Sequence, residues 1–138
     1  RARGLKDNNM MKDVWKKNLQ WGMVFVFLLT IIYISGSKNV ILTFTNIEKI
    51  VRLSEKYSYW IALYPITAFL GLTYYGIFTG SNMTLPVAQS TFLAFLIFTV
   101  SWKFIIPEFG NNGVWASLII FYFCRGIFLI PQLKKTLV

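Results

Sequence analysis

The residue types that usually carry enzymatic chemistry are scarce in this sequence. The chain has no histidine and a single cysteine, Cys124. Zinc and copper sites therefore lack their usual ligands, and no nucleophile can be paired with a histidine base within the chain. We expect no catalytic residue and no metal site, and the sequence does not predict an enzyme.

Arg125 is the one charged residue in an apolar stretch from Val114 to Leu133. An ionisable group at membrane depth is costly and is often functional. Arg125 is therefore a candidate buried charge that attracts an anionic group or tunes a carboxylate on a neighbouring helix. The alternative is a structural arginine that snorkels inward or caps helix carbonyls. The residues on its helical face, which we expect to point into a bundle, are Ser117, Phe121, Cys124 and Phe128.

A stripe of aromatic and hydroxyl side chains lies between Tyr59 and Phe78. The candidates for a substrate cavity at helical spacing are Tyr64, Thr67, Tyr74 and Tyr75. Aromatic faces hold lipophilic cations and hydroxyl groups add a few hydrogen bonds, which suits a cavity of broad specificity. Plain helix packing accounts for such a stripe equally well. Gln89, near the start of the next apolar stretch, is a weaker candidate of the same kind.

The composition places these groups in a membrane. Hydrophobic residues make up 56% of the 138 residues and charged residues only 14%, whereas roughly a quarter of a soluble domain is charged. In a bilayer, backbone polar groups must be paired within their own segment, so the spanning elements are helices of roughly 20 residues. We therefore expect an all-α polytopic membrane helix bundle. Its four predicted transmembrane helices are residues 21–36, 59–78, 87–106 and 114–133.

The remaining segments alternate between the two sides of the membrane. One side holds residues 1–20, 79–86 and 134–138, and the other holds residues 37–58 and 107–113. Val40 to Phe44 should extend the first span, and Asn46 should cap a short interfacial helix. Pro107 is expected to end the third span, and Gly110 to Gly113 to form a tight turn before the fourth.

The distribution of lysine and arginine predicts the orientation. The chain has a formal net charge of +9, and the side with both termini carries eight basic residues against five on the other. Both termini are therefore expected in the cytoplasm of a multi-pass protein of the inner (plasma) membrane. Most basic residues lie near the two ends of the chain and the others are few and in short clusters, which predicts no groove for nucleic acid.

No aspartate or glutamate lies inside a predicted span. Proton- or sodium-coupled transport generally uses an intramembrane carboxylate that exchanges an ion for substrate. A coupled transporter would need that carboxylate elsewhere, or another coupling group. The chain starts with Arg1 rather than Met, and its first twenty residues do not form a signal peptide. We therefore expect a fragment of a longer chain.

Five segments carry recognisable motifs. They are residues 3–7 (Arg-Gly-Leu-Lys-Asp), 42–46 (Leu-Thr-Phe-Thr-Asn), 65–80, 109–118 and 123–129. In this order they resemble the multidrug and toxic compound extrusion (MATE) family. The last two look closest to its DNA-damage-inducible protein F branch, in which a Gly-Asn-His/Asn-Gly-Leu-Trp turn and an Arg-Gly pair recur. The resemblance implies helices nine to twelve of a twelve-helix, two-lobed transporter.

The resemblance also implies an activity: secondary active efflux of drugs and organic cations by an H⁺- or Na⁺-coupled antiporter that works by alternating access. The coupling ion would be the only cofactor. The implied partners are the lipid bilayer, the amino-terminal remainder of the transporter and lipophilic or cationic small molecules. Many members carry an acidic residue where this chain has Tyr75, so the resemblance implies that coupling rests on an acidic residue of the first helix, outside this sequence.

Three alternative functions stay open. A lipid-linked oligosaccharide flippase of the wider superfamily should carry more basic residues in its cavity than the single Arg125. A complete four-helix multidrug transporter acting as a dimer would need its own membrane carboxylate. A non-transporting four-helix assembly subunit is compatible with the sequence if the chain is complete as given.

Overall fold

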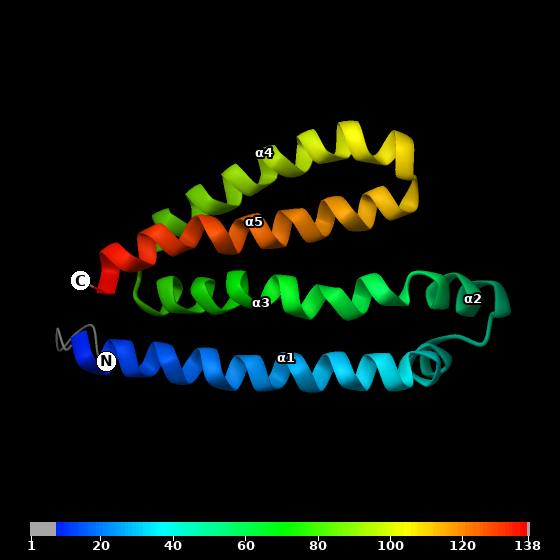
Figure 1. Ribbon diagram of the computed structural model, residues 1–138, viewed down its shortest axis with the longest axis horizontal. Helices are drawn as coiled ribbons and strands as arrows, with labels where there is room; N and C mark the ends of the chain where they lie inside the picture. Colours follow the sequence, from blue (N-terminus) through cyan, green and yellow to red (C-terminus); the bar gives the residue numbers. More distant parts are fainter. Residues whose placement is uncertain (1–7, 138) are drawn as a thin grey trace.

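The computed structural model describes residues 8–137, and every regular element in this range is a helix. The elements are α1 (Asn8–Phe44), α2 (Glu48–Lys56), α3 (Ser58–Gly80), α4 (Thr84–Phe109) and α5 (Asn111–Leu137) (Figure 1). The all-α class is confirmed. The Arg3 to Asp7 motif lies outside the described residues.

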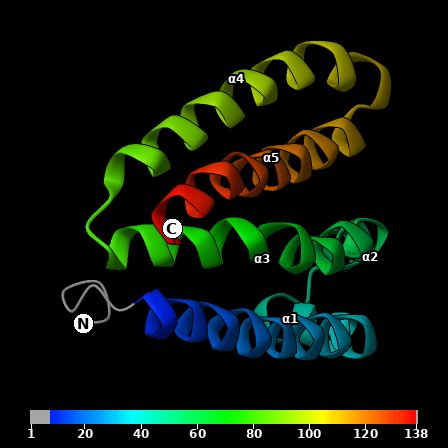
Figure 2. The same ribbon diagram turned by 60° about the vertical axis from the view of Figure 1, so that its left-hand side comes forward.

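Within the described range, α1, α3, α4 and α5 are each long and apolar enough to cross a membrane. They lie in the order α1, α3, α5, α4, so α5 is inserted between two helices that follow each other in the chain (Figure 1). Helices α3 and α5 therefore run in the same direction. The start of α1 and the end of α5 lie at one end of the bundle, and the short α2 lies at the other end (Figure 2).

Helix α1 begins earlier than the predicted first span. It starts at Asn8, so part of the segment predicted as a loop at 1–20 is helical, and it continues without a break to Phe44, in agreement with the predicted extension over Val40 to Phe44. No glycine or proline occurs between Asn8 and Trp21 to interrupt it. At 1.5 Å per residue, its 37 residues extend about 55 Å, well beyond a bilayer core of about 30 Å.

Two predicted helix ends are wrong. Ile47 rather than Asn46 holds the N-cap position of α2, and the Thr45 hydroxyl oxygen accepts the Ile47 N–H at 3.2 Å. Helix α4 passes through Pro107 and ends at Phe109. Gly110 turns the chain, because its φ of 54° and ψ of −127° lie in a region that other residues rarely adopt. Since α5 starts at Asn111, the turn is shorter than the predicted Gly110–Gly113 segment.

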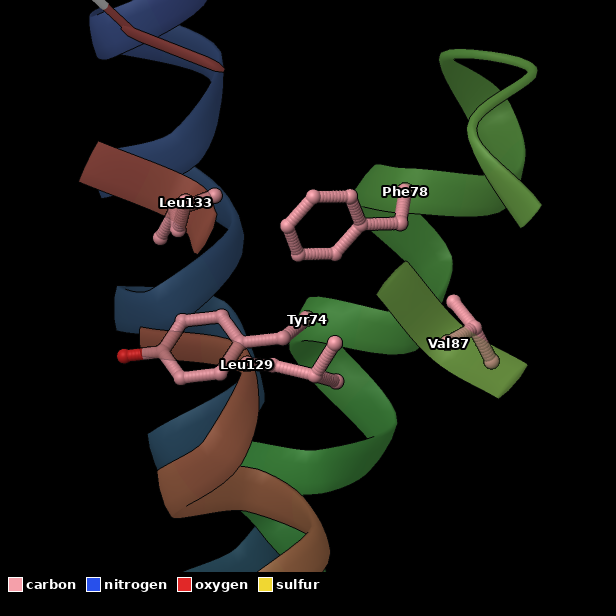
Figure 3. Packing of buried hydrophobic residues seen from close by; sticks show 5 residues of the cluster. All are labelled: Tyr74, Phe78, Val87, Leu129 and Leu133. Atoms are coloured by element: carbon pink, nitrogen blue, oxygen red, sulfur yellow. The ribbon is translucent and has the colours of Figure 1, made fainter. Parts of the chain in front are cut away.

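A cluster of buried side chains joins three helices at the end of the bundle that holds the termini. It consists of Tyr74 and Phe78 from α3, Val87 from α4, and Leu129 and Leu133 from α5 (Figure 3). Met11 and Trp15 pack against it from α1. The cluster therefore ties all four long helices together at this end.

Helices α3 and α5 come into backbone contact near their middle. A Cβ atom added to Gly126 would lie 3.0 Å from the Gly71 nitrogen and 3.1 Å from the Leu70 Cβ. Gly71 and Gly126 are both buried. Small residues at such crossings let membrane helices approach closely and gain packing energy.

The close contact predicts that Gly126→Val destabilises the bundle, because its methyl groups have no room. We expect a loss of about 1–3 kcal/mol in unfolding free energy, the usual range for overpacking. Thermal unfolding of the chain in detergent micelles measures the change. Gly76→Val is the matched control, since a Cβ at Gly76 has no heavy atom within 4 Å. Equal losses for the two variants would contradict the assignment.

Candidate functional site

The contact between α3 and α5, which we call the α3–α5 seam, contains most of the predicted aromatic stripe. The seam consists of Tyr59, Trp60, Tyr64, Gly71 and Tyr75 from α3 with Asn112, Tyr122, Arg125 and Gly126 from α5. Because the two helices are parallel, their side chains meet in a regular sequence from the α2 end to the end with the termini.

At the α2 end, Asn112 fastens the start of α5 to the start of α3. The Tyr59 hydroxyl donates to the Asn112 side-chain oxygen at 2.8 Å, and the Trp60 indole N–H donates to the same oxygen at 3.0 Å. One amide carbonyl with two lone pairs can accept both bonds. This contact explains why α5, an apolar helix, has the polar residue Asn112 near its start.

The middle of the seam is aromatic. The rings of Tyr64 and Tyr122 meet edge to face, with centroids 4.9 Å apart, and Phe121 continues the contact to Tyr122 at 5.3 Å. The Thr67 hydroxyl donates to the Tyr64 carbonyl of its own helix at 3.0 Å. Tyr64 and Thr67 therefore serve packing and local hydrogen bonding in this arrangement.

Next to the glycine contact, Arg125 lies over the ring of Tyr75. Its guanidinium carbon is 5.2 Å from the ring centroid, within the range of a cation–π interaction. The Nε atom of Arg125 is buried and has no hydrogen-bond partner among the described residues. Tyr75 keeps 42% of its surface exposed. The pair therefore lies at the edge of the seam, with one side open.

The two ion pairs found among the described side chains involve other residues. Lys38 pairs with Glu55 at 3.6 Å, and Arg52 pairs with Glu48 one turn away on α2. Both pairs are exposed and lie around α2, at the end of the bundle opposite the termini. Neither involves Arg125.

The other predicted cavity residues lie apart from this pair. Tyr74 is only 6% exposed and belongs to the buried cluster. Gln89 is exposed on α4 and accepts a hydrogen bond from the Gln132 side chain at 3.3 Å. Of the predicted residues, the structure therefore brings Tyr75 and Arg125 into direct contact, while Tyr64 and Thr67 lie farther along the same seam.

A groove of about 430 Å³ lies between α1 and α3 near the α2 end. Its walls are mainly apolar and include Tyr33, Ile34, Tyr59, Leu63 and Ile66. The predicted cavity residues and Arg125 are not part of this lining. The groove is therefore a separate feature of the α1 side.

Two residues of the α3–α5 seam, Asn112 and Tyr122, were not among the predicted site residues. The Gly-Asn-Asn-Gly turn and the Arg-Gly pair were signals, because each places an unusual residue in an apolar helix. Neither signal names its partner on α3. The residue on α3 that each one contacts depends on the position of α5 along α3. The spacing of residues within one helix does not determine this position.

The fold defines a polytopic membrane protein, with a partly buried arginine at the edge of the α3–α5 seam. The MatE family model matches residues 1–105, so the chain belongs to the MatE family of membrane transporters. It is 23% identical to DNA damage-inducible protein F of Escherichia coli (strain K12) over 128 residues, which are 93% of this chain and 28% of that protein. No solved structure matches the chain. The resemblance to MATE transporters is confirmed.

The shared acceptor predicts that Asn112→Ala weakens the α3–α5 seam. The change leaves the Tyr59 hydroxyl and the Trp60 N–H without their acceptor, which should cost about 1–2 kcal/mol of unfolding free energy. Thermal unfolding in micelles measures the loss, and a double-mutant cycle with Tyr59→Phe measures the coupling. Asn111→Ala is the control, because Asn111 is an exposed neighbour. A loss as large in the control would contradict the assigned role.

Proposed function

We propose that the chain is the carboxyl-terminal part of a secondary active transporter that expels drugs and organic cations in exchange for H⁺ or Na⁺. The single observation that carries the proposal is membership of the MatE family in a chain with four membrane-length helices among its described residues. The chain spans 28% of the length of its curated relative. The complete activity therefore belongs to a longer protein.

The packing supports a role as one moving unit. Alternating access requires groups of helices that move as rigid bodies around a binding site. The glycine contact between Gly71 and Gly126, the Asn112 acceptor and the buried end cluster hold α3, α4 and α5 together along their length. We propose that these helices move as a unit against the rest of the transporter.

Tyr75 is the proposed contact with substrate from this part of the chain. Its ring is the most exposed of the predicted cavity tyrosines, at 42%. Lipophilic cations bind aromatic faces through the ring quadrupole and apolar contact. Arg125 takes one place at this ring, so a cationic substrate would approach from the open side. The coupling carboxylate is proposed to lie elsewhere in the transporter, because the predicted spans 21–36, 59–78, 87–106 and 114–133 contain none.

A lipid-linked oligosaccharide flippase is the second candidate. The buried Arg125 Nε without a described hydrogen-bond partner favours it, because guanidinium groups bind phosphate oxygens well. Arg125 is the one cation near the middle of a predicted span, because Lys103 lies close to the end of span 87–106. A transporter of this second kind would show no efflux of a cationic dye.

The proposed orientation places both termini, and the α3–α4 turn, in the cytoplasm of the inner (plasma) membrane. Single cysteines introduced into a Cys124→Ser background test it with a membrane-impermeant maleimide on intact cells. We expect Asn111→Cys to be labelled from outside, and Gly80→Cys only after the membrane is opened. The reverse pattern would contradict the proposed orientation.

The proposed substrate contact predicts weaker efflux in the complete transporter when Tyr75→Ala removes the ring. We expect a loss of about fivefold, equivalent to roughly 1 kcal/mol of cation–π contact, with dye-evoked proton release retained. Tyr75→Phe is the matched control and should keep efflux, because it keeps the ring. Loss of dye-evoked proton release in the Tyr75→Ala variant would mean that Tyr75 belongs to the coupling machinery.

A further inference from the structure

Arg125 lies near the middle of α5, one of the four described helices that are long and apolar enough to cross a membrane. Helix α5 extends from Asn111 to Leu137, so Arg125 is about 21 Å from its start and about 18 Å from its end at 1.5 Å per residue. A charge at this depth must find compensation from a counter-charge, water or the backbone. The compensation that Arg125 receives determines what its surroundings can bind.

The side chain of Arg125 reaches the neighbouring helix. Its guanidinium carbon lies 5.2 Å from the ring centroid of Tyr75, on α3. A tyrosine ring in a helix covers the turn before its own Cα, so the Tyr75 ring is expected near the level of Gly71, which contacts Gly126. Tyr75 therefore covers one side of the guanidinium group.

The ring attracts the guanidinium but does not neutralise its charge. Buried Nε of Arg125 has no hydrogen-bond partner among the described residues. An arginine has five N–H groups and no acceptor, so it is satisfied best by a carboxylate that accepts two of them side by side. Arg125 is only partly buried, so such a group can reach its guanidinium from outside the described helices.

The described part of the chain contains no carboxylate that can reach this position. Asp13 lies near the start of α1, and Glu108 lies in the last turn of α4. Glu48 and Glu55 already pair with Arg52 and Lys38. The described residues therefore offer Arg125 no counter-charge, and the chain covers 28% of the length of its curated relative.

We propose that Arg125 and Tyr75 form a docking point for one carboxylate side chain, carried by a transmembrane helix of the transporter outside this sequence. Arg125 binds the carboxylate, and the Tyr75 ring holds the guanidinium at the edge of the seam. The proposal rests on the chain being part of a longer transporter. A permanent charge at this depth requires a permanent partner, which a transported substrate does not provide.

The test uses the complete transporter and measures its melting temperature in detergent. Arg125→Gln removes the cation and leaves the partner carboxylate buried and unpaired, so we expect a fall of several degrees. Arg125→Lys, which keeps the charge, should lose less. Each intramembrane Asp or Glu outside this sequence is then changed to Asn or Gln in the Arg125→Gln background. Neutralising the partner should restore the melting temperature, and neutralising the others should not.

Tyr75 offers a matched pair of variants that keep Arg125. Tyr75→Glu places a carboxylate beside Arg125 within the same lobe, whereas Tyr75→Gln has nearly the same shape without charge. We expect neutralisation of the partner carboxylate to be harmless in the Tyr75→Glu background and still destabilising in the Tyr75→Gln background. The two Tyr75 variants test the proposed ion pair even if the Arg125→Gln protein does not fold.

Three results would overturn the proposal. They are an unchanged melting temperature for Arg125→Gln, a loss that no neutralisation restores, and equal behaviour of the two Tyr75 variants. Sodium benzoate is the probe for a free carboxylate: stabilisation that depends on Arg125, with no rescue by neutralisation, would assign the position to a ligand instead. The melting temperature tests the ion pair and dye efflux tests the proposed function. A transporter that does not move dye can therefore still show the ion pair.

Discussion

The close approach of Gly71 and Gly126 is the contact on which the rest of the structure depends. With no side chain between the backbones, α3 and α5 are fixed in register. That register brings Asn112 to the start of α3 and places Arg125 over Tyr75. It also packs Leu129 and Leu133 against the ends of Tyr74 and Phe78. A shift of one turn along the seam would separate all of these partners.

The bilayer explains why so few polar contacts are needed. Each long helix pairs its backbone groups internally, and lipid can cover apolar side chains as protein does. The middle of α1 accordingly contains no buried residue, and large side chains such as Phe25, Phe27 and Ile34 are more than half exposed. Among the described residues, the side-chain hydrogen bonds between long helices are those of Asn112 with Tyr59 and Trp60, and that of Gln132 with Gln89.

The sequence predicts the helices well because each one depends on a local property, the length of an apolar run. All four spans appear as helices, and the family resemblance is confirmed. Helix ends depend on neighbouring residues and were predicted less accurately. Helix α4 continues past Pro107, and Ile47 rather than Asn46 holds the N-cap position of α2. The aromatic stripe was found, but its position in the seam depends on which helix packs beside α3. Helix α5 packs beside α3 although α4 separates the two in the chain. The spacing of residues within 59–78 does not reveal that α5 is the neighbour.

Helix α1 acts as a lever because it is one unbroken rod of 37 residues, about 55 Å long. A tilt of about 10° would move one end by about 10 Å relative to the other, a geometric consequence of this length. Its first turns contact the buried end cluster through Met11 and Trp15, while its far end leads into α2 through three residues. A rotation of the cluster at one membrane surface would therefore swing α2 across the opposite surface without any signal passing through side chains in between.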